Sequence, residues 1–237
     1  MSLTWHNIHE LPELLPGELH VWLIEIDSTL EESLLGNLLE TEGEQARRFK
    51  LPQRRTEFIA SRASLRGLLG GYLHLAPSAV PIELSKDGKP RLGSPGIDLK
   101  FNLSHSGDFL LMAFMNGSEV GADIECINID AMDDGTVMRS LHREELIRFK
   151  SLEDKEKSKF FFERWTMKEA FLKMLGCGFA IDPDAINLEG IGNAYEHAEG
   201  KGYFMGMPSV PGYCLSIATS AAPLKSLFYT PSSALLT

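Results

Sequence analysis

The segment from Glu153 to Leu175 most constrains the fold, because it contains neither Pro nor Gly and is rich in Lys, Glu, Phe, Leu and Met. This composition favours one long helix. Successive residues of a helix are about 100° apart, so one face of this helix gathers most of its large apolar side chains. They are Phe161, Phe162, Trp165, Leu172 and Leu175. We therefore expect this helix to pack on a sheet.

Glu169 falls inside this apolar face, between the directions of Trp165 and Phe162. We expect its carboxylate to be partly buried, and burial without a partner would raise its pKa and cost several kcal/mol. Lys173, one turn further along, can supply the compensating charge in the favourable Glu-to-Lys order. The alternative is an exposed surface pair, which would contribute less than about 1 kcal/mol.

An apolar run from Leu110 to Met115 is followed by Asn116-Gly117. Asn-Gly between two apolar runs predicts a hairpin, because both central residues of the turn need a positive φ. The second strand of this hairpin would span roughly residues 119 to 127.

Two carboxylates on that second strand share a face. Asp123 and Glu125 are two residues apart, so they point to one side while Ala122 and Ile124 point to the other. Carboxylates this close repel each other unless a cation lies between them. Their hard oxygen atoms suit Mg²⁺ rather than zinc. Taken alone, so short a motif leaves the alternative of two solvated acids open.

Ser104 and His105 invite comparison with a nucleophile and its base. Adjacent residues of a strand point to opposite faces, so the geometry of a hydrolase triad is not implied. A histidine with a purely structural role is the alternative to a functional His105.

Lys89 precedes Pro90, which restricts Lys89 to extended conformations and makes it a candidate for a functional lysine on a stiff loop. The alternative is an ordinary exposed lysine on the surface.

Three stretches of this chain, in this order, resemble the 4'-phosphopantetheinyl transferases of the surfactin-synthetase-activating type. They are Phe-Asn-Leu-Ser-His-Ser-Gly at 101–107, Val-Gly-Ala-Asp-Ile-Glu at 120–125 and Arg-Trp-Thr-Met-Lys-Glu-Ala-Phe-Leu-Lys at 164–173. Each piece alone is weak, but the combination is specific. The resemblance covers residues 40 to 180 approximately.

The resemblance implies a role for each candidate residue. The Mg²⁺ ligands would be Asp123, Glu125 and Glu169. The catalytic residues would be Glu169, which activates the acceptor serine directly or through a metal-bound water, and Lys173. A carboxylate that binds the metal tightly is a poor base, so the two roles of Glu169 compete. The residues that bind coenzyme A would be Lys89, Ser104, His105 and Lys173.

The chain departs from the family pattern in two places. Two family lysines that would hold the phosphates of coenzyme A are replaced by Glu42 and Gln45. The surrounding region is locally basic, and we expect Arg54 to supply that contact. The β-branched residue that the family prefers before the first acid is Ala122 here, where we expect an effect on packing only.

The composition excludes several classes of protein. The net charge of −10 argues against a broad nucleic-acid surface. No stretch approaches the roughly 18 to 20 apolar residues of a membrane span, and the N-terminus lacks a signal-peptide pattern. The cysteines, which are Cys126, Cys177 and Cys214, show no C-x-x-C spacing and are typical of free thiols in the cytoplasm.

We expect an α+β fold of two similar halves, each a small antiparallel sheet packed by a long helix. The pseudo-twofold relation between the halves is implied by the resemblance. Residues 1–97 would form the N-terminal half, which binds coenzyme A, and residues 98–237 the C-terminal half, which binds Mg²⁺ and carries out catalysis. Coenzyme A would lie in the cleft between them. One chain completes such a site, so we expect a monomer.

The predicted function is the Mg²⁺-dependent transfer of the 4'-phosphopantetheine arm of coenzyme A to a serine of an apo acyl, peptidyl or aryl carrier protein, with release of 3',5'-ADP. Two alternatives remain open. One is a Mg²⁺-dependent hydrolase of nucleotide pyrophosphates, which would use water in place of the serine. The other is a noncatalytic protein that binds carrier proteins, although the intact acids and Lys173 argue against it.

Overall fold

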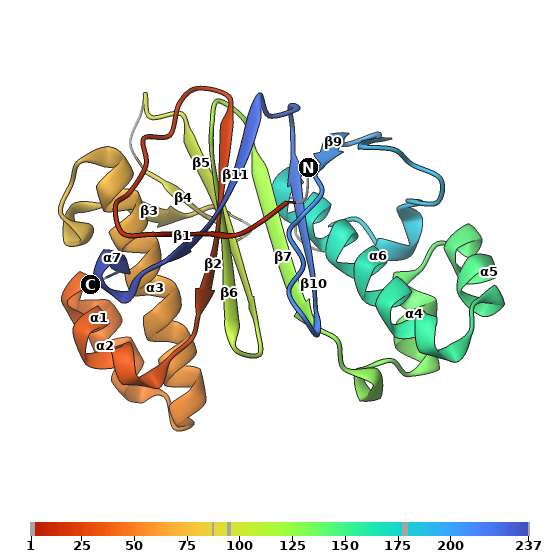
Figure 1. Ribbon diagram of the computed structural model, residues 1–237, viewed down its shortest axis with the longest axis horizontal. Coiled ribbons are helices and arrows are strands. Elements are labelled where there is room, and N and C mark those ends of the chain that lie inside the picture. The colour runs from red at the N-terminus through yellow and green to blue at the C-terminus, as the bar shows by residue number, and fades with distance from the viewer. Residues whose placement is uncertain (1–2, 87, 94–95, 177–179, 237) are drawn as a thin grey trace.

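Two β-sheets lie face to face at the centre of the computed structural model, and helices cover their outer faces (Figure 1). The structure describes residues 3–86, 88–93, 96–176 and 180–236. In strand order, the first sheet consists of β1 (His6–Ile8), β11 (Lys225–Pro231), β2 (Glu18–Glu25), β6 (Phe109–Asn116) and β5 (Leu99–Ser106). The second consists of β7 (Val120–Cys126), β10 (Tyr213–Thr219), β9 (Gly200–Phe204) and β8 (Ala194–His197). A separate hairpin pairs β3 (Ile82–Leu84) with β4 (Pro90–Leu92).

The helices fall into two groups, one for each sheet (Figure 1). Beside the first sheet lie α1 (Glu31–Leu34), α2 (Glu40–Arg48), α3 (Pro52–Leu73) and α7 (Ser233–Leu236). Beside the second lie α4 (Asp134–Ser140), α5 (Arg143–Ser151) and α6 (Asp154–Leu175). The long helices α3 and α6 both have 22 residues, so each sheet is packed by one long helix. This confirms the predicted α+β class and the predicted long helix near residues 153–175.

The core between the sheets follows from strand alternation. Every second side chain of β2 and β6 points toward the second sheet, and every second side chain of β7 points back. The buried set is Leu19, Val21, Leu23, Leu111, Ala113, Met115, Val120, Ala122 and Ile124. Ala122 is therefore a packing residue that faces away from the two acids, as the alternation predicts.

Helix α6 packs on the outer face of the second sheet at unusually short range. Gly121 of β7 lies so close to the helix that a Cβ atom there would collide with the backbone of Ala170 and Met174. Only Gly permits this approach. The glycine of the Val-Gly-Ala-Asp-Ile-Glu stretch thus brings α6 against the strand that carries both acids.

The sheets are antiparallel except along β11, which runs parallel to β1 and β2. Strands β5, β6 and β11 all follow residue 97 in the sequence but belong to the first sheet. The boundary between the two sheets consequently lies between β6 and β7, and a second crossing returns the chain to the first sheet at β11.

The predicted hairpin at Asn116-Gly117 is wrong. Gly117 does have a positive φ of 91°. However, β6 pairs with β2 and β5, whereas β7 pairs with β10. The turn dipeptide fixes the local backbone but not the pairing partners, and the apolar faces of β6 and β7 stack across the two sheets instead.

The C-terminal part of the chain adds strands to both sheets. Strand β9 ends at Phe204 in the second sheet, and β11 lies in the first sheet between β1 and β2. The apolar residues Ile186 and Leu188 are buried but belong to no strand, and the Leu188 N–H donates to a side chain oxygen of Glu145 at 2.9 Å.

Two other sequence expectations concern the cysteines and membranes. Cys126 and Cys214 are free thiols, and Cys177 lies outside the described residues. Within the described ranges, no helix is long and apolar enough to cross a membrane.

Candidate functional site

Hydrogen bonds from side chains of β5 join the edges of the two sheets. Oδ1 of Asn102 accepts from the N–H of Ala122 at 3.0 Å, and Oγ of Ser104 donates to Oδ1 of Asp123 at 2.9 Å. Asn102 and Ser104 are two residues apart and therefore share the face of β5 that meets β7. These bonds bring the first two sequence stretches together.

The third stretch reaches the same place from α6. Nζ of Lys173 donates to Oδ1 of Asp123 at 2.6 Å and to Oγ of Ser104 at 3.0 Å. The sequence predicted that Lys173 would pair with Glu169, but no salt bridge between these two occurs in the described part of the chain. Lys173 pairs with Asp123 instead of Glu169 because the close approach of α6 at Gly121 places Asp123 within its reach.

Asp123 is the most deeply buried acid of the group, with 2% of its surface exposed. Burial raises its pKa to about 7, while Lys173 opposes the shift and the charge of Glu125 adds to it. Oδ2 of Asp123 is also buried and accepts no hydrogen bond from any residue that the structure describes. A buried oxygen without a partner is costly, so this atom is a natural position for a ligand.

Glu169 is partly buried, as its place in the apolar face predicts. Burial raises the pKa of its carboxyl group, Lys173 lowers it, and Glu125 raises it again. The charge of Glu125 therefore acts on both Asp123 and Glu169. Across residues 3–86, 88–93, 96–176 and 180–236, however, no three His, Cys, Asp or Glu side chains form a metal-binding cluster.

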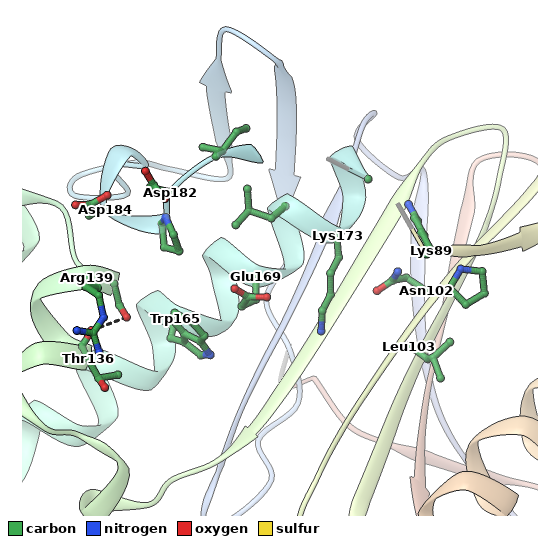
Figure 2. A pocket seen from close by; sticks show the side chains of 17 residues that line it. Lys89, Asn102, Leu103, Thr136, Arg139, Trp165, Glu169, Lys173, Asp182 and Asp184 are labelled. Atoms are coloured by element: carbon green, nitrogen blue, oxygen red, sulfur yellow. Dashed lines mark hydrogen bonds between the residues drawn. The ribbon is translucent and has the colours of Figure 1, made fainter. Parts of the chain in front are cut away.

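A cavity of about 780 Å³ opens beside these residues. Figure 2 shows Glu169 and Trp165 on α6, with Lys173, Lys89 and Asn102 to one side of them. On the other side lie the α4 residues Thr136 and Arg139 and the acids Asp182 and Asp184. The cavity therefore has a cationic end against the sheets and a mixed end against α4.

Lys89 belongs to the loop between β3 and β4, and its side chain is only 17% exposed. Its Nζ atom lies 3.2 Å from the carboxylate of Glu119 and donates to the carbonyl oxygens of Val120 and Met174 at 3.4 and 3.3 Å. The Met174 carbonyl is in the last turn of α6, where a cation is favourable. Lys89 is thus held in the lining of the cavity. The preceding turn residue Asp87 lies outside the described residues.

His105 and Arg54 form a second group on the opposite face of β5. Nε2 of His105 lies 3.7 Å from Oε2 of Glu57, and Nη1 of Arg54 lies 3.0 Å from the same oxygen. This confirms that Ser104 and His105 point to opposite faces. The candidate residues for coenzyme A are therefore divided, with Lys89, Ser104 and Lys173 near the acids and His105 and Arg54 beyond the strand.

Glu42, which replaces a lysine of the family pattern, has a structural role. Its carboxylate accepts two hydrogen bonds from the buried guanidinium of Arg66, at 2.6 and 3.1 Å. It also accepts from the N–H of Leu39 at 3.0 Å, which caps α2. This pairing ties α2 to α3, and the Glu42 carboxylate is occupied by hydrogen bonds within the protein.

Several residues near the site were not predicted from the sequence to have a function. Ser106 donates to Glu125 at 2.9 Å, and Lys168, the neighbour of Glu169, is wholly buried and lies 2.5 Å from Glu145. Spacing from Ser104 could have indicated Ser106, because residues two apart share a strand face. Arg139 and Asp182 come from loops and short helices whose position no sequence pattern fixed.

Comparison with known proteins now adds independent information. A family model described as the 4'-phosphopantetheinyl transferase superfamily matches residues 119–202, which span β7, α6 and β8. The 4'-phosphopantetheinyl transferase HetI of Nostoc sp. strain PCC 7120 is 38% identical over 172 residues, which cover 70% of this chain and 72% of HetI. The chain belongs to the 4'-phosphopantetheinyl transferase superfamily.

More distant relatives agree with this assignment. A putative 4'-phosphopantetheinyl transferase of Synechocystis sp. strain PCC 6803 is 29% identical, over 68% of this chain and 65% of the relative. The 4'-phosphopantetheinyl transferase Sfp of Bacillus subtilis strain 168 is 25% identical, over 61% of this chain and 63% of Sfp. The transferase is therefore an enzyme, and the cavity beside Lys173 and Glu169 is the candidate for its active site.

Proposed function

We propose that this transferase moves the 4'-phosphopantetheine arm of coenzyme A to a serine hydroxyl of an apo acyl, peptidyl or aryl carrier protein and releases 3',5'-ADP. The observation that carries the proposal is the meeting of Lys89, Glu169 and Lys173 around one cavity, with Asp123 bonded to Lys173. The two lysines line the same cavity as Glu169, whose pKa is raised by burial, and this supports the binding of a pyrophosphate there. The two sheet-and-helix halves in one chain further support the surfactin-synthetase-activating type.

Coenzyme A would lie along the junction of the two sheets. Its pyrophosphate fits the cationic end of the cavity, where Lys89 and Lys173 stand. The third phosphate of coenzyme A would reach past the end of β5. There it would meet His105 and Arg54, which lie on the face of β5 opposite Ser104. In this arrangement one chain supplies both halves of the site, and we propose that it acts as a monomer.

The residues present fit a Mg²⁺ ion held by Asp123 and Glu125. Mg²⁺ in proteins is commonly bound by one or two carboxylates together with substrate phosphates, so no cluster of three protein ligands is required. Oδ2 of Asp123 is buried without a partner among the described residues. When bound, the ion would offset charge on the pyrophosphate and on the leaving group.

Glu169 is our candidate for the base. It lines the cavity, and burial raises the pKa of its carboxyl group, which makes it a stronger base than an exposed glutamate. It would accept the proton of the carrier serine, directly or through a water. The competing role is a third contact to the metal ion.

The reaction exchanges one phosphorus–oxygen bond for another and moves one proton. The serine oxygen attacks the phosphorus that bears the pantetheine arm, the serine proton passes to Glu169, and the phosphoanhydride bond breaks so that 3',5'-ADP leaves. Lys173, which Asp123 and Ser104 hold in place, would offset the charge that develops on the breaking anhydride.

Chromatographic detection of 3',5'-ADP tests this function against the two alternatives. The transferase, coenzyme A and Mg²⁺ are incubated with and without an apo carrier protein. Release only with the carrier supports transfer. Release at the same rate without a carrier would establish a hydrolase, and no release with any of several carriers would favour a noncatalytic binding protein.

A further inference from the structure

The hydroxyl group of Ser106 lies between the backbone and the side chain of β7. Its Oγ atom accepts a hydrogen bond from the N–H of Cys126 at 3.0 Å and lies 2.9 Å from Oε2 of Glu125. A backbone N–H can only donate, so the hydroxyl oxygen is the acceptor in the first bond. An ionised carboxylate can only accept, so the hydroxyl group donates its proton to Oε2 of Glu125.

Ser104 repeats this arrangement two residues earlier. Its Oγ atom accepts from the ammonium of Lys173 at 3.0 Å and donates to Oδ1 of Asp123 at 2.9 Å. Each of the two acids on β7 is therefore bonded through one oxygen to a serine of β5. The serines and the acids have the same two-residue spacing, so the strands present them in register.

We propose that Ser106 is a positioning residue that orients Glu125 for binding of the divalent cation. The inference rests on the proposed function, because it takes Glu125 as a ligand of that cation. With Oε2 bonded to Ser106, the other oxygen of Glu125 is the one left for the ion. Groups that hydrogen-bond to ligating carboxylates fix the ligand and commonly change metal affinity when they are removed.

A purely structural role for Ser106 gives a different expectation. The bond from Cys126 ties β5 to β7, so loss of the hydroxyl group would lower the stability of the protein under either interpretation. Only the positioning role changes the affinity of the folded protein for a cation. The test therefore measures binding, well below the unfolding temperature, rather than stability or turnover.

The experiment measures Mn²⁺ binding by electron paramagnetic resonance in the full-length protein with saturating coenzyme A and no carrier protein. Ser106→Ala should weaken Mn²⁺ binding about tenfold or more, and Ser106→Thr, which keeps the hydroxyl group, should bind within about twofold of the wild type. Ser64→Ala is the matched control, because the Ser64 hydroxyl group is also buried but lies on α3, beside the first sheet. This control should leave the affinity unchanged.

Glu125→Gln separates the inference from the proposed function. If Glu125→Gln binds Mn²⁺ as tightly as the wild type, the proposed metal site itself is wrong. If Glu125→Gln loses binding but Ser106→Ala retains it, the metal site stands and the positioning role is overturned. Equal weakening in Ser106→Ala and Ser106→Thr also overturns it, because the hydroxyl group would then not be the cause.

Discussion

The ammonium group of Lys173 lies 2.6 Å from Oδ1 of Asp123, and Ser104 bonds to both. This contact joins α6 to β7 and β5 at one point. It leaves Oδ2 of Asp123 buried and without a hydrogen-bond partner among the described residues. The lysine thus neutralises one side of the acid while the other side remains available to a cation.

The pH dependence of stability should reveal the buried Asp123. Its pKa is raised from 3.8 to about 7 in the folded protein, so the folded state binds the proton more tightly than the unfolded state. This contribution to stability is fully present below pH 4 approximately and is lost as the pH rises through 7. Asp123→Asn cannot titrate, so the free energy of unfolding of the wild type minus that of the variant should fall across this range.

Urea denaturation at several pH values in EDTA measures this difference. Asp130→Asn removes an exposed acid that lies a few residues beyond β7 and is the matched control for the loss of one carboxylate. A difference for Asp123→Asn that is constant, or that grows with pH, would contradict the assignment of a raised pKa.

Replacement of Glu169 by Gln should lower kcat by about 10² to 10⁴-fold, the usual contribution of a general base. The KM for coenzyme A should change little, because the amide keeps the size of the side chain. Steady-state kinetics at saturating Mg²⁺ provide the measurement. Glu163→Gln, an exposed change on the same helix, should behave like the wild type. A variant of Glu169 with normal kcat would exclude it as the base.

Lys89→Ala should mainly raise the KM for coenzyme A, since Lys89 lines the cavity and is proposed to hold a phosphate. Lys86→Ala provides the control, because Lys86 is exposed on the same hairpin. An effect of Lys89→Ala on kcat alone would refute the phosphate contact.

The buried pair of Lys168 and Glu145 should matter for stability. Both side chains are wholly buried, and Glu145 also accepts hydrogen bonds from the N–H groups of His142 and Leu188. Lys168→Met leaves an unpaired buried charge and should lower the free energy of unfolding by about 3–5 kcal/mol. Lys155→Met, at an exposed position of the same helix, should cost far less. Similar losses of free energy of unfolding in the two variants would show that the buried pair contributes no more to stability than an exposed pair.

The sequence predicted those features that depend on local pattern. Alternation placed Asp123 and Glu125 on one face and separated Ser104 from His105, and helical periodicity predicted the partial burial of Glu169. These predictions need only the geometry of a single element. The resemblance to a known family then predicted that the three stretches form one site, although the sequence shows none of their contacts.

The remaining features depend on which elements meet. Lys173 pairs with Asp123 rather than Glu169 because α6 approaches β7 at Gly121, and no pattern within α6 predicts that distance. Strand β11 joins the first sheet beside β2, although most of the chain separates them. Asn116-Gly117 predicted a turn but not the stacking of β6 on β7. Pairing partners are set by tertiary packing, which a single sequence does not display.

The most direct test of the proposed function is intact-mass spectrometry of an apo carrier protein incubated with the transferase and coenzyme A, with Mg²⁺ or with EDTA. The account predicts that the carrier gains the mass of one phosphopantetheine with Mg²⁺ and none with EDTA. It also predicts that Asp123→Ala and Glu125→Ala remain folded and lose most of this transfer. A full mass gain in EDTA, or normal rates in both variants, would contradict the proposed site.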